Sequence, residues 1–99
     1  MTESGEKLRV GILGLRRGLT HLRNFLQVPG AEVIACADRL EIPRQRAREV
    51  IGDRPVRVVH EFDDMLELHP DAVVIASNGR QQAAHSIQAM RAGCHVLSE

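Results

Sequence analysis

Three glycines near the amino terminus have the spacing and surroundings of a phosphate-binding loop. The stretch VGILGLRRG places Gly11, Gly14 and Gly18 between an apolar run and a segment of helical periodicity. Glycine lets the backbone turn sharply and approach a pyrophosphate, which the free amides at a helix amino terminus can bind. The usual GxGxxG spacing would need glycine in place of Arg16, and Gly18 follows Gly14 one position too early. We therefore predict an altered, shortened phosphate loop that includes Leu15.

Two arginines, Arg16 and Arg17, stand at the centre of this loop. Guanidinium groups form paired hydrogen bonds with phosphate oxygens, so either side chain could supply contacts that the missing glycine does not. The alternative is that both are solvated loop residues, and the sequence leaves the two interpretations open.

An acidic residue follows the second apolar run of the chain. Asp38 directly follows AEVIACA, 24 positions beyond Gly14, where a carboxylate accepts hydrogen bonds from the adenosine ribose of a dinucleotide. Asp38 could instead cap the following turn, but with the glycine turn in place we favour the ribose role. The neighbouring Arg39 could accept the additional phosphate of NADP. We favour NAD as the cofactor and leave NADP open.

Apolar runs of strand length alternate with segments of helical period along the whole chain. This alternation is typical of βαβ units that build a parallel sheet covered on both faces. We predict strands at 8–13, 32–37, 56–59, 72–76 and 95–97.

The segments between these strands are expected to form four crossover helices. The first carries apolar residues at helical spacing from Leu15 to Leu26. The second opens at Pro43 and closes at Gly52. In the third, Asp63 is the expected cap, and His69-Pro70 ends the helix. The fourth spans about 80–92, ends at Gly93, and is expected to have an apolar face formed by Ala83, Ile87 and Met90.

These elements predict an α/β fold, a Rossmann-type doubly wound parallel sheet of about five strands with helices on both faces. Ligands of such sheets bind at the carboxyl ends of the strands between which the strand order reverses, here the first and the fourth. That rule indicates Gly14 and Ser77. We expect one dinucleotide-binding domain over 8–99, preceded by a flexible amino terminus at 1–7, with no domain boundary inside it.

Composition excludes several other classes of protein. The 99 residues include thirteen basic and thirteen acidic ones, so nothing attracts a nucleic acid or an anionic membrane over long range. Cys36 and Cys94 lie in or beside apolar runs without metal-ligand spacing, which indicates buried free thiols and suits the cytoplasm. No export signal is visible, the histidines lack the spacing of a zinc site, and no set of catalytic residues emerges.

The chain also resembles a known family, the amino-terminal domain of the Gfo/Idh/MocA (glucose-fructose oxidoreductase and inositol dehydrogenase) proteins. The resemblance covers 8–99 and rests on RVGILG, AEVIACADR, PDAVVIAS, AHSIQAMRAG and HVLSE. It implies that a larger substrate domain follows, and that this chain is truncated before it.

The resemblance also assigns roles to individual residues. Ser77, Asn78 and Gly79 occupy the family's Thr-Pro-Asn turn, which lies on the nicotinamide side of the cofactor. Glu99 matches the acidic residue of the Glu-Lys-Pro motif, whose lysine is commonly catalytic and would follow the last residue here. His85 matches a helix histidine, which we interpret as structural. No catalytic residue is assigned within this chain.

The function predicted from these features is that of an NAD(P)-binding domain of an oxidoreductase. Its parent would transfer hydride to or from a sugar, cyclitol or related hydroxy compound, with the small-molecule substrate bound only by the full-length protein. One alternative is a non-catalytic nucleotide-binding, regulatory or oligomerisation module, and another is a related domain for a different nucleotide. The unpaired edge of the last strand favours self-association into a homo-oligomer.

Overall fold

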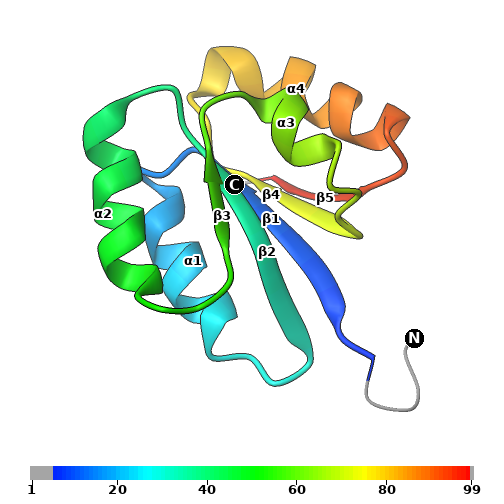
Figure 1. Cartoon of the computed structure of the whole chain (residues 1–99). Coiled ribbons are helices and arrows are strands. Elements are labelled where there is room, and N and C mark those ends of the chain that lie inside the picture. The colour runs from blue at the N-terminus through cyan, green and yellow to red at the C-terminus, as the bar shows by residue number, and fades with distance from the viewer. Residues whose placement is uncertain (1–5, 99) are drawn as a thin grey trace.

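A computed structural model describes residues 6–98 and shows one parallel sheet of five strands in the order β3-β2-β1-β4-β5 (Figure 1). The prediction of a Rossmann-type sheet is confirmed. Residues 1–5 and Glu99 lie outside the described part, and with them most of the expected flexible terminus and the prediction for Glu99. The strands are β1 (Leu8–Leu13), β2 (Ala31–Ala37), β3 (Arg57–Val59), β4 (Ala72–Ile75) and β5 (His95–Ser98).

Helices cover both faces of the sheet. They are α1 (Gly18–Leu26), α2 (Glu41–Ile51), α3 (Phe62–Leu66) and α4 (Gly79–Arg91). The helices α1 and α2 lie on one face, and α3 and α4 on the other (Figure 1). The chain moves outward from β1 to β3 and then returns to β4, which pairs with β1 on its free side. The carboxyl ends of β1 and β4 therefore lie side by side at the reversal, as predicted.

Two apolar clusters fill the layers between the sheet and the helices. Because successive strand residues point to opposite faces, Val10 and Ile12 of β1 pack on the side of α1 and α2, whereas Leu13 packs on the side of α3 and α4. The first cluster contains Val10, Ile12, Leu15, Leu22, Val33, Cys36, Ala47, Ile51 and Val74. The second contains Leu13, Ala35, Ala37, Phe62, Met65, Val73, Ile75, Ala89 and Cys94.

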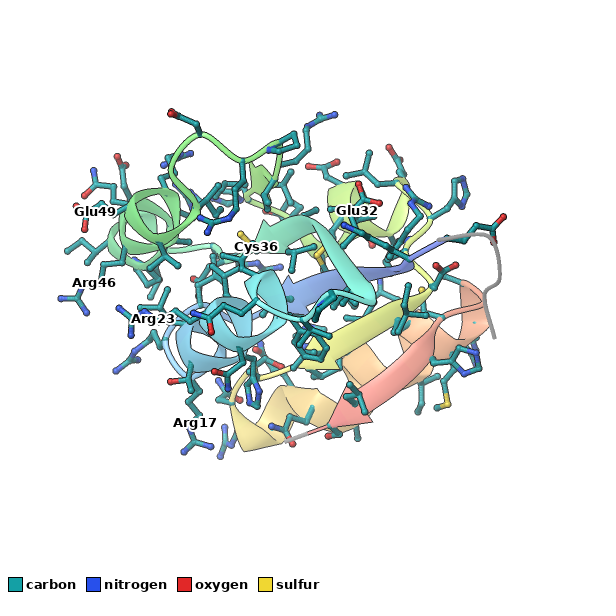
Figure 2. All side chains as sticks on the ribbon, turned by 90° about the horizontal axis from the view of Figure 1, so that it is seen from below. Arg17, Arg23, Glu32, Cys36, Arg46 and Glu49 are labelled. Atoms are coloured by element: carbon teal, nitrogen blue, oxygen red, sulfur yellow. The ribbon has the colours of Figure 1, made fainter. Side chains whose placement is uncertain are left out.

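The two cysteines are buried free thiols, as the sequence predicts. Burial raises the pKa of Cys36 to about 12 and also raises the pKa of Cys94, so both remain protonated and poorly nucleophilic. Arg46 and Glu49, in contrast, project from α2 away from the sheet (Figure 2). None of the helices within 6–98 is long and apolar enough to cross a membrane.

Two helix starts differ from the prediction. The helix α2 begins at Glu41 rather than Pro43, which lies in the first turn, where its missing N–H is tolerated. The helix α3 begins at Phe62 after Glu61, and its amino terminus has no side-chain cap among the described residues. Asp63 does not cap this helix, because it is the second residue inside it. Its carboxylate accepts a hydrogen bond from Gln88 of α4.

The apolar face of α4 is exposed and does not pack against the sheet. Ile87 and Met90 are 46% and 56% exposed, and Ala83 is exposed as well. The face that packs against the sheet and α3 carries the buried Ala89 and the half-buried His85. The large hydrophobic residues of α4 therefore point outward, while the half-buried Gln82, His85 and Gln88 lie on the inner side of the helix, beside the carboxyl end of the sheet and α3.

Candidate functional site

Gly14 forms the turn that joins β1 to α1. This turn packs against the backbone at the end of β4. Its φ is +91°, a conformation that residues with a side chain rarely adopt. A Cβ added there would lie 2.7 Å from the carbonyl carbon and oxygen of Ala76 and 2.9 Å from the backbone nitrogen of Ser77. Glycine is thus required both by the dihedral angle and by the closeness of the neighbouring backbone.

The other two glycines of the motif serve the packing of helices on β1. A Cβ at Gly18, the first residue of α1, would lie 3.0 Å from Cγ2 of Ile12, so this glycine lets α1 approach the strand closely. A Cβ at Gly11 would lie 2.9 Å from Sδ of Met65 in α3. Gly11 therefore faces α3 from the middle of the strand, at a distance from the turn itself.

Leu15 anchors the loop between these elements. Its side chain is fully buried in the cluster beneath α1 and α2. Its N–H donates to Oδ2 of Asp38 at 2.8 Å, and the N–H of Gly14 donates to the carbonyl oxygen of Ala37 at 2.9 Å. Both amides are thus engaged by the end of β2. An anion in this region would therefore meet the amino terminus of α1, the end of a helix at which anions bind.

Positive charge gathers at the amino terminus of α1. Arg16 and Arg17 immediately precede the helix and are exposed, and the first turn contains no acidic residue. The helix dipole adds partial positive charge at the same point. This end of α1 is consequently suited to an anionic group.

Asp38 connects the glycine turn to the loop that follows β2. Besides the bond from Leu15, its Oδ1 accepts the N–H of Leu40 at 2.8 Å, which is the turn-capping role weighed as the alternative. An ionised carboxylate offers about four lone-pair sites, so these two bonds leave capacity for further donors. Capping the turn and binding an external hydroxyl are therefore compatible.

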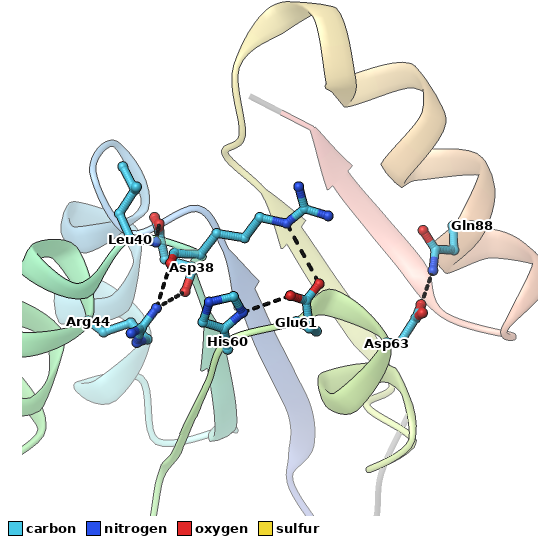
Figure 3. A network of polar contacts seen from close by, with 8 residues as sticks. Asp38, Leu40, Arg44, His60, Glu61, Asp63 and Gln88 are labelled. Carbon is cyan, nitrogen blue, oxygen red and sulfur yellow. Dashed lines mark hydrogen bonds and ion pairs between the residues drawn. The ribbon is translucent and has the colours of Figure 1, made fainter.

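Arg39 forms an ion pair with a residue that follows a different strand. Its Nε lies 3.6 Å from Oε1 of Glu61, which immediately precedes α3, and Nδ1 of His60 lies 2.7 Å from Oε2 of the same carboxylate (Figure 3). Nη1 of Arg44 donates at 2.8 Å to the carbonyl oxygens of both Asp38 and Arg39 and so orders the loop. This network links the ends of β2 and β3.

Polar groups from α4 meet the end of β4. Oγ of Ser77 lies 2.9 Å from Nδ1 of His85, and Nε2 of Gln82 donates to the carbonyl oxygen of Ser77 at 3.0 Å. Asn78 caps α4 by accepting the N–H of Arg80 at 3.1 Å, and Gly79 is the first residue of the helix.

These groups surround a cavity of about 450 Å³ at the carboxyl edge of the sheet. Six residues predicted as site residues line it, from the glycine turn after β1 and from the ends of β2 and β4. They are Gly14, Arg16, Asp38, Arg39, Ser77 and Asn78. Of the others, Gly11, Leu15, Arg17, Gly18 and Gly79 lie in the surrounding turn and elements rather than in its lining.

Residues 8–99 match the profile of a family described as the oxidoreductase family with an NAD-binding Rossmann fold. This match covers nearly the whole chain. The chain belongs to the Gfo/Idh/MocA family.

Relatives with known names agree with that membership. Inositol 2-dehydrogenase 3 of Saccharopolyspora erythraea is 34% identical over 93% of this chain. The scyllo-inositol dehydrogenase of Lactobacillus casei, solved with NAD(H) and scyllo-inositol, superposes on 94% of the chain with a TM-score of 0.80 and 30% identity. A variant 3-ketoreductase of Actinomadura kijaniata, solved with TDP-benzene and NADP, gives a TM-score of 0.80, 28% identity and 94% coverage. The chain spans only 27%, 28% and 30% of these three proteins.

This Gfo/Idh/MocA domain lines its cavity with residues that sequence reasoning did not select. His85, Gln81 and Gln88 of α4 face the cavity together with Asn78, and Phe62 faces it from α3. The signal was present, because positions 78, 81, 85 and 88 recur at the spacing of one helix face. Sequence reasoning did not select these residues because it considered only the apolar face of α4.

Proposed function

We propose that the cavity at the carboxyl edge of the sheet binds NAD. The observation that carries the proposal is the meeting of three features: the Gly14 turn, the Asp38 carboxylate bonded to that turn, and the end of β4 at Ser77. Their arrangement supports an extended ligand with an anionic centre over α1 and a hydroxyl-bearing group beside β2.

This arrangement suggests a position for each of the three parts of the dinucleotide. The pyrophosphate is proposed to lie over the first turn of α1, where Arg16 lines the cavity. The adenosine ribose is proposed to donate its hydroxyl hydrogens to Asp38. Because β1 lies between β2 and β4, the other half of the molecule then extends toward Ser77, Asn78 and Gly79.

Charge at the ribose position favours NAD over NADP. The Asp38 carboxylate would repel the additional phosphate of NADP. Arg39 is paired with Glu61, and Arg44 donates to two backbone carbonyls, so both nearby guanidinium groups have other partners. Binding of NADP would require at least one of them to move.

For the whole protein we propose an oxidoreductase that acts on a cyclitol, sugar or related hydroxy compound. The names of the relatives support this substrate class, since two of them are inositol dehydrogenases. Bound NAD would supply the hydride acceptor, and the described residues would hold and orient it.

Calorimetric titration of the 99-residue chain with NAD⁺ and with NADP⁺ tests the proposal. We expect saturable binding of NAD⁺ and weaker binding of NADP⁺ because of the repulsion at Asp38. Absence of saturable binding for both cofactors, in a sample shown by circular dichroism to be folded, would refute a dinucleotide function for the cavity.

The phosphate role of Arg16 has its own test. We expect Arg16→Ala to raise the Kd for NAD⁺ about threefold to tenfold, because one exposed charge-assisted contact is lost. The loss should shrink at high salt, since screening weakens an exposed contact. Arg46→Ala, an exposed arginine of α2 away from the cavity, is the matched control and should leave Kd unchanged. Equal Kd values for wild type and Arg16→Ala would show that Arg16 is only a solvated loop residue.

A further inference from the structure

The hydroxyl of Ser77 forms a hydrogen bond with the side chain of His85 in α4. The two side chains are hydrogen-bonded at 2.9 Å, and both line the cavity. The imidazole in turn packs edge-on against Phe62, with ring centroids 5.3 Å apart and an interplanar angle of 75°. His85 is thus fixed by α3 on one side and directed at the end of β4 on the other.

The backbone at Ser77 has little freedom to move. Its carbonyl oxygen accepts a hydrogen bond from Nε2 of Gln82. Oε1 of Gln82 in turn accepts a hydrogen bond from the hydroxyl of Ser98 at 3.4 Å. The next residue, Asn78, is held as the cap of α4. Because these hydrogen bonds hold the backbone, what can still change at Ser77 is the direction of its hydroxyl hydrogen. The hydrogen bond to His85 determines that direction.

Topology determines which part of a dinucleotide meets this hydroxyl. Asp38 ends β2 and Ser77 follows β4, on opposite sides of β1. A ligand whose adenosine ribose lies on Asp38 and whose pyrophosphate lies over α1 must place its nicotinamide half on the side of Ser77. The carboxamide of that ring carries both donors and an acceptor for a hydroxyl group.

We propose that His85 is a positioning residue that directs the Ser77 hydroxyl toward the nicotinamide carboxamide of NAD. This inference rests on the proposed function. In the neutral imidazole with its proton on Nε2, Nδ1 accepts the Ser77 hydroxyl hydrogen, which leaves the Ser77 oxygen free to accept an N–H of the carboxamide. In the protonated imidazole, Nδ1 donates to that oxygen, so the hydroxyl hydrogen turns into the cavity and the hydroxyl becomes a donor rather than an acceptor toward the carboxamide.

Protonation of His85 would also place a positive charge near the cationic ring of NAD⁺. Burial, and secondarily the charge of Arg39, lower the pKa of His85, so the neutral form dominates at pH 7. The charged and titratable groups that line the cavity from the neighbouring elements are Arg16 after β1, Asp38 and Arg39 after β2, His60 after β3, and Glu61 and Asp63 at α3. The α4 neighbours Gln81, Gln82 and Gln88 are uncharged. Acidification therefore changes His85 from an acceptor of the Ser77 hydroxyl into a donor, and its new positive charge repels the cationic nicotinamide ring.

The pH dependence of ligand binding separates this role from simple packing. Affinities of the chain for NAD⁺ and for ADP-ribose, which lacks nicotinamide, are to be measured by calorimetry between pH 8 and pH 5. For the wild type we expect the Kd for NAD⁺ to rise about fivefold on acidification through the His85 pKa, the size of one screened like-charge contact. The Kd for ADP-ribose should change much less.

Two variants complete the experiment. His85→Gln cannot become charged and should remove the difference in pH dependence between the two ligands. His95→Gln, an exposed histidine of β5 that does not line the cavity, should retain that difference. If wild type and His85→Gln show the same pH profiles, or if ADP-ribose follows NAD⁺, the role of His85 is overturned while NAD binding stands. Failure of both ligands to bind at every pH would overturn the proposed function and this inference together.

Discussion

Replacing Gly14 with alanine is expected to destabilise the domain and abolish NAD⁺ binding. The new Cβ would stand 2.7 Å from the backbone of Ala76, which cannot rotate away as a side chain can. The φ of +91° is also unfavourable for alanine. Because the overpacking and the dihedral strain add, we expect the free energy of unfolding to fall by about 2 to 4 kcal/mol. Urea denaturation measures the stability, and calorimetry measures the affinity.

Gly93 provides a matched control for the backbone contribution. Its φ is +90°, almost equal to that of Gly14, yet an added Cβ meets no atom of 6–98 within 4 Å. Gly93→Ala should therefore cost only about 1 kcal/mol of stability and preserve binding. Equal urea midpoints for the two variants would show that the contact between the glycine turn and β4 is not rigid, and would remove the main structural reason for placing a pyrophosphate there.

Asp38→Ala is expected to raise the Kd for NAD⁺ about thirtyfold, because bonds from two ribose hydroxyls to a charged acceptor would be lost. The Kd for NADP⁺ should rise less, since the same change removes the repulsion of its phosphate. Stability should also fall by about 1 to 3 kcal/mol, because the N–H groups of Leu15 and Leu40 lose their acceptor. Paired titrations with both cofactors measure the shift in preference.

Two further variants separate loss of the ribose contact from loosening of the loop. Asp38→Asn keeps the size and one oxygen acceptor but removes the charge, so NADP⁺ should gain relative to NAD⁺ while most of the loop order remains. Asp53→Ala replaces an exposed aspartate outside the cavity and should change neither affinity. An unchanged NAD⁺ affinity in folded Asp38→Ala protein would restrict Asp38 to its turn-capping role.

The cavity combines rigid and adaptable walls. Gly14 and Ser77 belong to backbone that is packed against itself, whereas Arg39 and Glu61 form an exposed pair, with side chains 76% and 47% exposed, between the ends of β2 and β3. Exposed pairs of this kind contribute little to stability, so they can rearrange at low cost when a ligand enters. The cofactor preference is therefore expected to depend on Asp38 more than on Arg39.

The sequence by itself determined the order of the elements and the position of the reversal. Apolar runs of strand length and helical periodicity are local patterns, and the preference for right-handed crossovers then leaves few ways to assemble them. Gly14 and Asp38 were identified for the same reason, because the turn after β1 and the end of β2 are marked by residues adjacent to them in the chain. Their meeting through the N–H of Leu15 follows from the parallel pairing of these two strands.

Only the tertiary structure decided which face of α4 turns inward, where Arg39 points, and what His85 contacts. The apolar residues Ile87 and Met90 predicted the opposite face, because amphipathicity assumes that the helix buries its most hydrophobic side. Here α4 instead directs His85 at Ser77 and Gln88 at Asp63 of α3. Such contacts depend on the rotation of one helix relative to strands and helices far away in sequence, and no local pattern of residues specifies that rotation.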